Sequence, residues 1–339
     1  MTYVSVLSEL KKQTPRPLYL VTGNQPYLAN QLRQAFRALV PESEQTMNFA
    51  TYDMETTPVA QALDDAMSAP FFGERRLVFI DRATFLTTEK GGKVDHDIDG
   101  LLQYIEHPEP TSVVVIFVTG KLDSRKKLVK TLKKQAEVVA LEALGERQIQ
   151  TLLADRLAVD GYTIDDPAFE QLQQRTGGDL TLMMNELPKL ELACYDTKII
   201  TSSVVGELVT KTLDQNVFDL VNAVMAKKIN EALTLYRGLI LTKEEPLRIN
   251  AVLVSQFRLL IQCQILARNG YSQGTIASTL KVHPYRVKLA LQSLRHLQQV
   301  NLKRAYLGLI EIEKDLKSTS QDPMTLFELF MLKYASQAA

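Results

Sequence analysis

The chain has 339 residues, of which 45% are hydrophobic and 23% are charged, and its 39 lysines and arginines balance 39 aspartates and glutamates. This composition is typical of a globular protein and excludes an intrinsically disordered one, which would have few apolar residues and a large net charge. Because the chain has no excess of basic residues, it is a poor candidate for a protein that binds nucleic acid over much of its surface. Any nucleic-acid contact is expected to be local.

Residues 1–142 alternate short apolar runs with helical patterns. The expected strands are 18–22, 47–52, 75–81, 112–120 and 136–141. The run SVVVIFVTG at 112–120 is apolar at nearly every position, as in a strand that is buried on both faces of a parallel sheet. The expected helices between these strands are 27–40, 59–67, 96–107 and 124–135. This alternation predicts an α/β domain, a mostly parallel sheet with helices on both faces.

The strand signal fades after residue 142. Asp165 or Asp166 is expected to cap one helix and Asp179 the next, and Pro188 is expected to kink or split the helix after Asp179. From about residue 211 the pattern is helical throughout. We therefore expect three domains: the α/β domain at 1–142, a small helical domain at 143–210 and a larger helical domain at 211–339.

The turn after the first expected strand is where a phosphate-binding loop would lie. Such a loop needs the pattern G-x-x-x-x-G-K-[ST], because its backbone N–H groups and lysine bind phosphate and its hydroxyl holds Mg²⁺. Gly23 occupies the first position, but Leu28, Ala29 and Asn30 replace the second glycine, the lysine and the hydroxyl residue. A tight turn that binds no nucleotide is therefore the preferred interpretation.

A nucleotide site would also need a metal-binding acid after the third strand. Asp81 ends that strand, but Arg82 follows it instead of a second acid. The catalytic patterns HExxH, GxSxG and CxxC are absent from the sequence. We therefore expect no catalytic residue, no metal site and no cofactor in this chain.

The order of these features resembles the bacterial DNA polymerase III delta subunits, the clamp-opening members of the sliding-clamp loader. The resemblance covers essentially the whole chain and rests on YLVTGNQPYL (19–28), APFFGERRLVFID (69–81), VTGKLDSRKKLVKTLKK (118–134) and RTGGDLTLMMNELPKL (175–190). It implies a degenerate P-loop-NTPase-like (AAA+-type) sheet domain, a small helical lid domain and a C-terminal helical collar domain. The phosphate-sensing arginine of the related ATPases is replaced by Thr181 or Leu180, and Ser124-Arg125 lacks the cysteine of their arginine finger.

Two adjacent aromatic residues, Phe71 and Phe72, lie between an expected helix and an expected strand, bounded by Pro70 and Gly73. Both rings cannot easily face inward in so short a connection, so at least one is expected to be exposed or packed under the loop. The alternative interpretation is that both rings fill the edge of the core. The resemblance favours a binding role, because an apolar pair at this point in the delta family wedges into the sliding clamp. Pro70 and Gly73 are expected to shape the loop.

A basic segment at 121–134 contains seven lysines and arginines against a single aspartate. The spacing of residues 126, 130 and 133/134 puts several charges on one face of a helical pattern, and Lys126, Lys127 and Lys130 are candidate contacts for DNA phosphates. A solvated outer helix explains the same pattern equally well.

A second basic segment, residues 272–297, has the pattern of a helix-turn-helix. Tyr285, Arg286 and Lys288 would then face a DNA groove, and the chain would be a DNA-binding regulator. The apolar spacing of the segment instead favours two helices packed within the helical domain. We keep the regulator as the alternative function.

The cellular compartment follows from simple features. Cys194 and Cys263 have no metal-ligand spacing, and a disulfide framework is not plausible, which indicates a reducing compartment. Glu9 and Lys11 interrupt any signal-peptide core, and no stretch of 18 uncharged apolar residues predicts a membrane span. We expect a cytoplasmic protein.

With the resemblance, these features predict a non-catalytic delta subunit that helps to open the sliding clamp for loading onto primed DNA. The implied partners are the sliding clamp (beta subunit), the ATPase and delta-prime subunits of the clamp loader, and primer-template DNA within the assembled complex. DNA polymerase activity resides in other subunits of the DNA polymerase III holoenzyme, and the implied location is the nucleoid-associated replisome.

Overall fold

The structure, a computed structural model, describes residues 3–89, 92–142, 144–295 and 299–336. Contacts within the chain divide it into two compact units, Met1–Ala143 and Leu144–Ala339. The boundaries of the three expected domains, and the functional identity of each domain, stay predictions.

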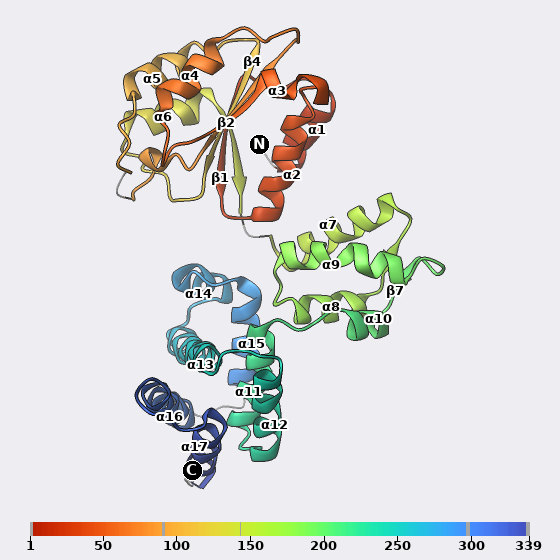
Figure 1. The fold of residues 1–339 in the computed structure, drawn as a ribbon, viewed down its shortest axis with the longest axis vertical. Helices are drawn as coiled ribbons and strands as arrows, with labels where there is room; N and C mark the ends of the chain where they lie inside the picture. The colour runs from red at the N-terminus through yellow and green to blue at the C-terminus, as the bar shows by residue number, and fades with distance from the viewer. Residues whose placement is uncertain (1–2, 90–91, 143, 296–298, 337–339) are drawn as a thin grey trace. The chain divides into compact units, whose positions relative to one another are not determined.

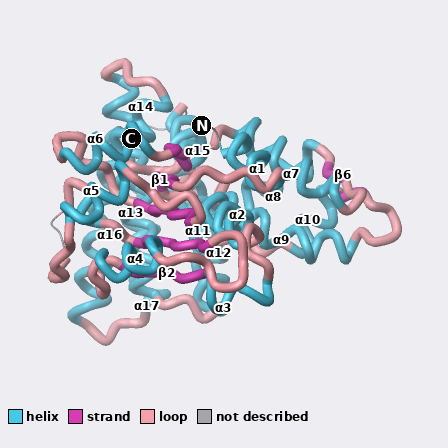
Figure 2. The backbone as a smooth tube through the Cα atoms, turned by 90° about the horizontal axis from the view of Figure 1, so that it is seen from above, coloured by secondary structure: helices cyan, strands magenta, loops and turns pink. Residues whose placement is uncertain are grey.

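The first unit is built on a five-stranded sheet in which every pairing is parallel. The strand order is β2-β3-β4-β1-β5, with β1 at Leu18–Gly23, β2 at Phe49–Asp53, β3 at Arg76–Asp81, β4 at Ser112–Val118 and β5 at Glu137–Leu141. All seven residues of β4 are buried, as expected for a strand that is covered on both faces. Figure 2 shows the strands of this sheet lying side by side.

Helices cover both faces of the sheet, which confirms the expected fold (Figure 1). One layer consists of α4 (Val59–Met67), α5 (Ile98–Glu106) and α6 (Lys127–Gln135), and the other contains α1 (Tyr3–Lys11) and α2 (Pro26–Arg37). The α4–α6 layer packs on aliphatic strand residues such as Leu20, Ile80 and Ile116. On the other face, aromatic rings of α2 and the strands meet edge to face.

Two helices of the first unit were not expected. Val6 and Leu10 bury one side of α1. The four-residue helix α3 (Gln45–Asn48) occupies the beginning of the expected strand 47–52, so β2 begins only at Phe49. Asn48 therefore ends a helical turn instead of starting a strand.

The second unit begins with α7 (Glu146–Val159), α8 (Asp166–Arg175), α9 (Leu180–Ala193) and α10 (Ser202–Leu208). The side chain of Asp165 accepts a hydrogen bond from the Ala168 N–H and caps α8, and Asp179 caps α9, as expected. The helix α9 continues through Pro188, so the chain is not split there. The strands β6 (Thr163–Ile164) and β7 (Ile199–Ile200) form a short parallel sheet (Figure 2). The sequence pattern did not predict these two strands.

The rest of the second unit is helical, as expected. Its helices are α11 (Leu213–Met225), α12 (Ile229–Leu241), α13 (Pro246–Arg268), α14 (Gln273–Leu280), α15 (Pro284–Leu294), α16 (Gln299–Ser318) and α17 (Pro323–Ser336). The helix α13 packs against α11, α15 and α16. Among the described residues it is the one helix long and apolar enough to cross a membrane, but 56% of its apolar stretch is buried within the protein. Phe257, Leu260 and Cys263 belong to the core of the bundle, so we interpret α13 as a core helix.

Gly23, at the end of β1, is required by the packing of the sheet. Its φ is +116°, and a Cβ atom at this position would lie 2.2 Å from the carbonyl oxygen of Leu141. We expect Gly23→Ala to lower the free energy of unfolding of the first unit by about 2 kcal/mol or more, because it adds both backbone strain and a clash with a main-chain atom. Chemical denaturation followed by circular dichroism measures this loss.

The matched control is Gly92→Ala in the same unit. A Cβ at position 92 would meet no atom within 4 Å, and the backbone there is not left-handed. Equal stability of the two variants would contradict the role assigned to Gly23.

Candidate functional site

The turn that a nucleotide would need is used for packing within the first unit. The helix α2 begins at Pro26, which has no N–H to offer an anion. The Leu28 side chain is buried, and the Ala29 N–H already donates to the carbonyl of Gln25. Asn30 is exposed. Leu28, Ala29 and Asn30 thus supply neither the cation nor the hydroxyl group that a phosphate-binding loop has at these positions.

At the same edge of the sheet, the carboxylate of Asp81 forms an ion pair with the guanidinium of Arg33 from α2. The guanidinium carbon lies 3.7 Å from the centroid of the Phe117 ring, so the arginine is held by charge and by an aromatic face. Arg82 pairs in turn with Asp53. These ion pairs line a hollow of about 360 Å³ formed by Arg33, Asp53, Asp81, Arg82, Phe117 and Thr119. Asp81 therefore neutralises an arginine of its own chain.

The loop at residues 68–75, between α4 and β3, presents the two expected aromatic residues to solvent. The exposed fraction is 91% for Phe72 and 53% for Phe71. The two rings contact each other edge to face, with their centroids 4.6 Å apart. The structure therefore excludes the alternative in which both rings fill the edge of the core. Pro70 and Gly73, which bound the pair, are half-buried.

This Phe71–Phe72 loop is held at its middle and at its ends. The side-chain oxygen of Asn48 accepts from the N–H of Phe71 at 2.7 Å, and its NH₂ group donates to the carbonyl of the same residue at 2.9 Å. An ion pair between Asp65 and Arg76 joins the end of α4 to the beginning of β3. The loop therefore has a defined backbone conformation in which both aromatic rings are exposed.

Gly73 leaves room for the side chains of Glu44 and Asn48. A Cβ atom there would lie 2.2 Å from a carboxylate oxygen of Glu44 and 2.9 Å from the side-chain nitrogen of Asn48. The expected role of Gly73 in shaping the loop thus has a physical basis.

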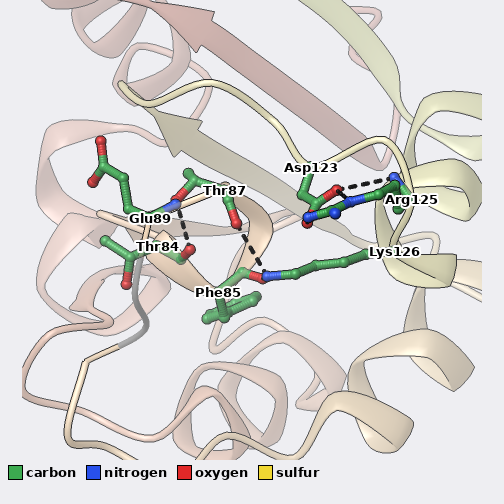
Figure 3. A network of polar contacts seen from close by, with 7 residues as sticks. All are labelled: Thr84, Phe85, Thr87, Glu89, Asp123, Arg125 and Lys126. Carbon is green, nitrogen blue, oxygen red and sulfur yellow. Dashed lines mark hydrogen bonds and ion pairs between the residues drawn. The ribbon is translucent and has the colours of Figure 1, made fainter.

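The three candidate lysines of the basic segment differ in their surroundings. The ammonium group of Lys126 donates to the carbonyls of Phe85 at 2.7 Å and Thr87 at 3.1 Å (Figure 3). Lys127 and Lys130 are exposed on α6. Lys126 therefore ties two loops of the first unit together, and Lys127 and Lys130 are the better candidates for contact with a phosphate group.

Beside Lys126, the carboxylate of Asp123 receives two hydrogen bonds of 2.8 Å from the guanidinium of Arg125 (Figure 3). These bonds hold the pKa of the Asp123 carboxyl well below its usual range and raise the pKa of Arg125. Much of the positive charge that Arg125 adds to the basic segment is therefore balanced locally.

Among the described residues, no group of three or more His, Cys, Asp or Glu side chains is arranged to hold a metal ion.

The helix-turn-helix pattern corresponds to α14 and α15, with residues 296–297 of the segment outside the described residues. The residues expected to face a DNA groove instead contact the second unit itself. The Tyr285 side chain packs so closely on Gly178 that a Cβ there would lie 2.9 Å from it. Lys288 pairs with Glu146 at 2.7 Å, and Arg286 lies 3.5 Å from Asp214. These contacts favour packing within the unit over groove binding.

The sequence indicates the aromatic pair but neither its buried anchor Asn48 nor the arginine that pairs with Asp81. Asn48 and Phe71 are 23 positions apart, and Arg33 and Asp81 are 48 positions apart. No local pattern marks such pairs. The one available signal for Asn48 was a polar residue at the start of an apolar run.

Comparison with known proteins agrees with the resemblance. A family profile described as DNA polymerase III, delta subunit, matches residues 19–142, and a second profile, for the C-terminal domain of the same protein family, matches residues 214–334. The chain is 36% identical over 331 residues to the DNA polymerase III subunit delta of Bacillus subtilis (strain 168), covering 97% of this chain and 95% of that protein. It is 24% identical over 263 residues to a probable delta subunit of Aquifex aeolicus (strain VF5), covering 76% and 74%.

A solved structure is also similar over the full length. The DNA clamp loader delta protein of Bacillus subtilis superimposes with a TM-score of 0.78 at 34% identity, covering 99% of this chain and 100% of that one.

The two kinds of lysine in the basic segment should respond differently to substitution. We expect Lys126→Met to lower the free energy of unfolding by about 1–3 kcal/mol, because it leaves two carbonyls without their charged donor. Lys130→Met should stay within about 0.5 kcal/mol of the wild type, because its side chain is exposed. Thermal unfolding measures both, and equal effects would contradict the distinction.

Proposed function

The chain belongs to the family of DNA polymerase III delta subunits, and we propose that within the clamp loader it binds the sliding clamp through the Phe71–Phe72 loop. Binding there would help to open the clamp ring for loading onto primed DNA during replication. The observation that carries the proposal is the exposed aromatic pair on a loop whose backbone is held in place.

The aromatic pair has enough apolar surface to anchor a complex. Burying a phenylalanine side chain contributes about 1.5–3 kcal/mol relative to leaving it exposed, and Phe72 is almost fully exposed. Anchors of this kind dominate the binding energy of many protein interfaces. If the loop binds a distorted clamp interface more tightly than a closed one, its binding energy shifts the clamp toward the open state.

We assign this chain a mechanical role and no bond chemistry. Two features support this assignment. Asp81, the candidate metal-binding acid, is paired with Arg33, and Leu28, which replaces a glycine of the phosphate-binding pattern, is buried in the core. ATP binding and hydrolysis would then belong to the ATPase subunits. The chain would join these and the delta-prime subunit through a collar domain at 211–339, preceded by a lid domain at 143–210.

As a bacterial replication protein, the chain works in the cytoplasm, and we place it at the nucleoid-associated replisome. Primer-template DNA would be a partner only within the assembled clamp loader. The exposed Lys127 and Lys130 support a contact with its phosphates, since clustered cations release counterions when they bind DNA.

The clamp-binding role predicts a strong effect of Phe71→Ala/Phe72→Ala. Removing two anchor rings should cost about 2 kcal/mol each and raise the Kd for the organism's own sliding clamp about a thousandfold. Surface plasmon resonance with the full chain, without ATP, measures this change.

The matched control is Leu192→Ala/Tyr195→Ala, which removes two exposed apolar side chains from the second unit. It should bind the clamp like the wild type. Absence of binding by the folded wild type, or equal losses in both double variants, would refute the proposed site.

A separate prediction concerns DNA. In the assembled clamp loader, Lys127→Ala/Lys130→Ala should weaken binding to primed DNA and lower the slope of log K against log salt by about one for each lost phosphate contact. The exposed pair Lys11→Ala/Lys12→Ala is the control, with an unchanged slope. An unchanged slope in the first variant would show that α6 is only a solvated helix.

A further inference from the structure

We propose that Asn48 is a positioning residue for clamp binding, which sets the affinity of the Phe71–Phe72 loop without touching the clamp. The inference rests on the proposed function and adds to it a buried residue outside the loop. The juxtaposition that carries it is the side-chain amide of Asn48 against both main-chain polar groups of Phe71.

The amide of Asn48 replaces a strand partner for the loop. Its oxygen accepts from the Phe71 N–H at 2.7 Å and its nitrogen donates to the Phe71 carbonyl at 2.9 Å, which is the exchange of two hydrogen bonds that paired strands make. Asn48 is fully buried, so neither bond competes with bulk water. A single side chain thus fixes the backbone at the first aromatic residue.

This anchoring matters because the next residue is strained. The φ of Phe72 is +56°, in the left-handed region that bulky residues avoid. That conformation lets Phe72 stand out from the loop while its ring contacts Phe71. Without the bonds from Asn48 the loop would relax into other conformations, and clamp binding would have to order it again at a cost in affinity.

The topology explains why Asn48 can reach the loop. Asn48 immediately precedes β2, and the loop leads into β3. The two strands are parallel neighbours with Phe49 beside Leu77, so their amino-terminal connections lie at the same edge of the sheet. Gly73 completes the arrangement, because a Cβ at this position would displace the Asn48 nitrogen.

The chemistry requires an amide at position 48. An aspartate would still accept from the Phe71 N–H, but its second oxygen would face the Phe71 carbonyl and repel it. Asn48→Asp is therefore a nearly isosteric test of the donor bond, and Asn48→Ala removes both bonds. Asn30→Asp is the matched control, since it makes the same chemical change at an exposed position of the same unit.

The experiment uses the full chain, the organism's sliding clamp and surface plasmon resonance without ATP. We expect Asn48→Ala to raise the Kd about ten- to a hundredfold, the range expected for two lost hydrogen bonds. Asn48→Asp should raise the Kd about tenfold, because it loses the donor bond and places a carboxylate oxygen against the Phe71 carbonyl. Asn30→Asp should bind like the wild type. Phe71→Ala/Phe72→Ala is measured alongside to report on the loop itself.

Amide hydrogen exchange separates positioning from general destabilisation. In Asn48→Ala the Phe71 amide loses its acceptor and should exchange at least tenfold faster than in the wild type, while the amide of Phe79 in β3 keeps its protection. Loss of protection at both amides would mean that Asn48 only supports the fold, and would overturn the proposal.

The outcomes distinguish this inference from the proposed function. If Asn48→Asp binds as tightly as the wild type while the double phenylalanine variant loses binding, the positioning role is wrong and the clamp site stands. If the folded wild type does not bind, the proposed function is wrong, and the role of Asn48 in clamp binding is wrong with it.

Discussion

The parallel pairing of β2 with β3 is the constraint on which the candidate site depends. In a parallel sheet all strands begin at one edge and end at the other, so the connections that enter neighbouring strands lie together. Asn48 directly precedes β2 and the Phe71–Phe72 loop directly precedes β3, so the buried amide of Asn48 lies beside the loop. The usual ligand edge of such a sheet is the opposite one, at the carboxyl ends of the strands.

That opposite edge is used for packing and charge balance. Gly23 lets β1 approach the carbonyl of Leu141, and Asp81 neutralises Arg33. The first unit thus has a parallel sheet covered by helices on both faces, and at its carboxyl edge Asp81 pairs with an arginine of the same chain. The exposed aromatic pair, through which we propose that the chain binds the clamp, lies at the amino edge.

The sequence was enough to predict features that depend on local pattern. The alternation of apolar runs predicted the five strands and the helices between them. The adjacent phenylalanines between Pro70 and Gly73 predicted that at least one ring is exposed or packed under the loop, and both rings are exposed. Features that depend on distant residues could not be found this way. The helical turn at Asn48 looked like the start of a strand, and the ion pair of Arg33 with Asp81 exists only after the sheet has formed.

The most direct test of the account is photocrosslinking from the tip of the loop. Phe72 would be replaced by the photoreactive analogue p-benzoylphenylalanine in the full chain, with the same replacement at the exposed Tyr195 as the control. The account predicts a covalent product with the sliding clamp from position 72 and none from position 195. A chain that still binds the clamp but gives no crosslink from position 72 would contradict it.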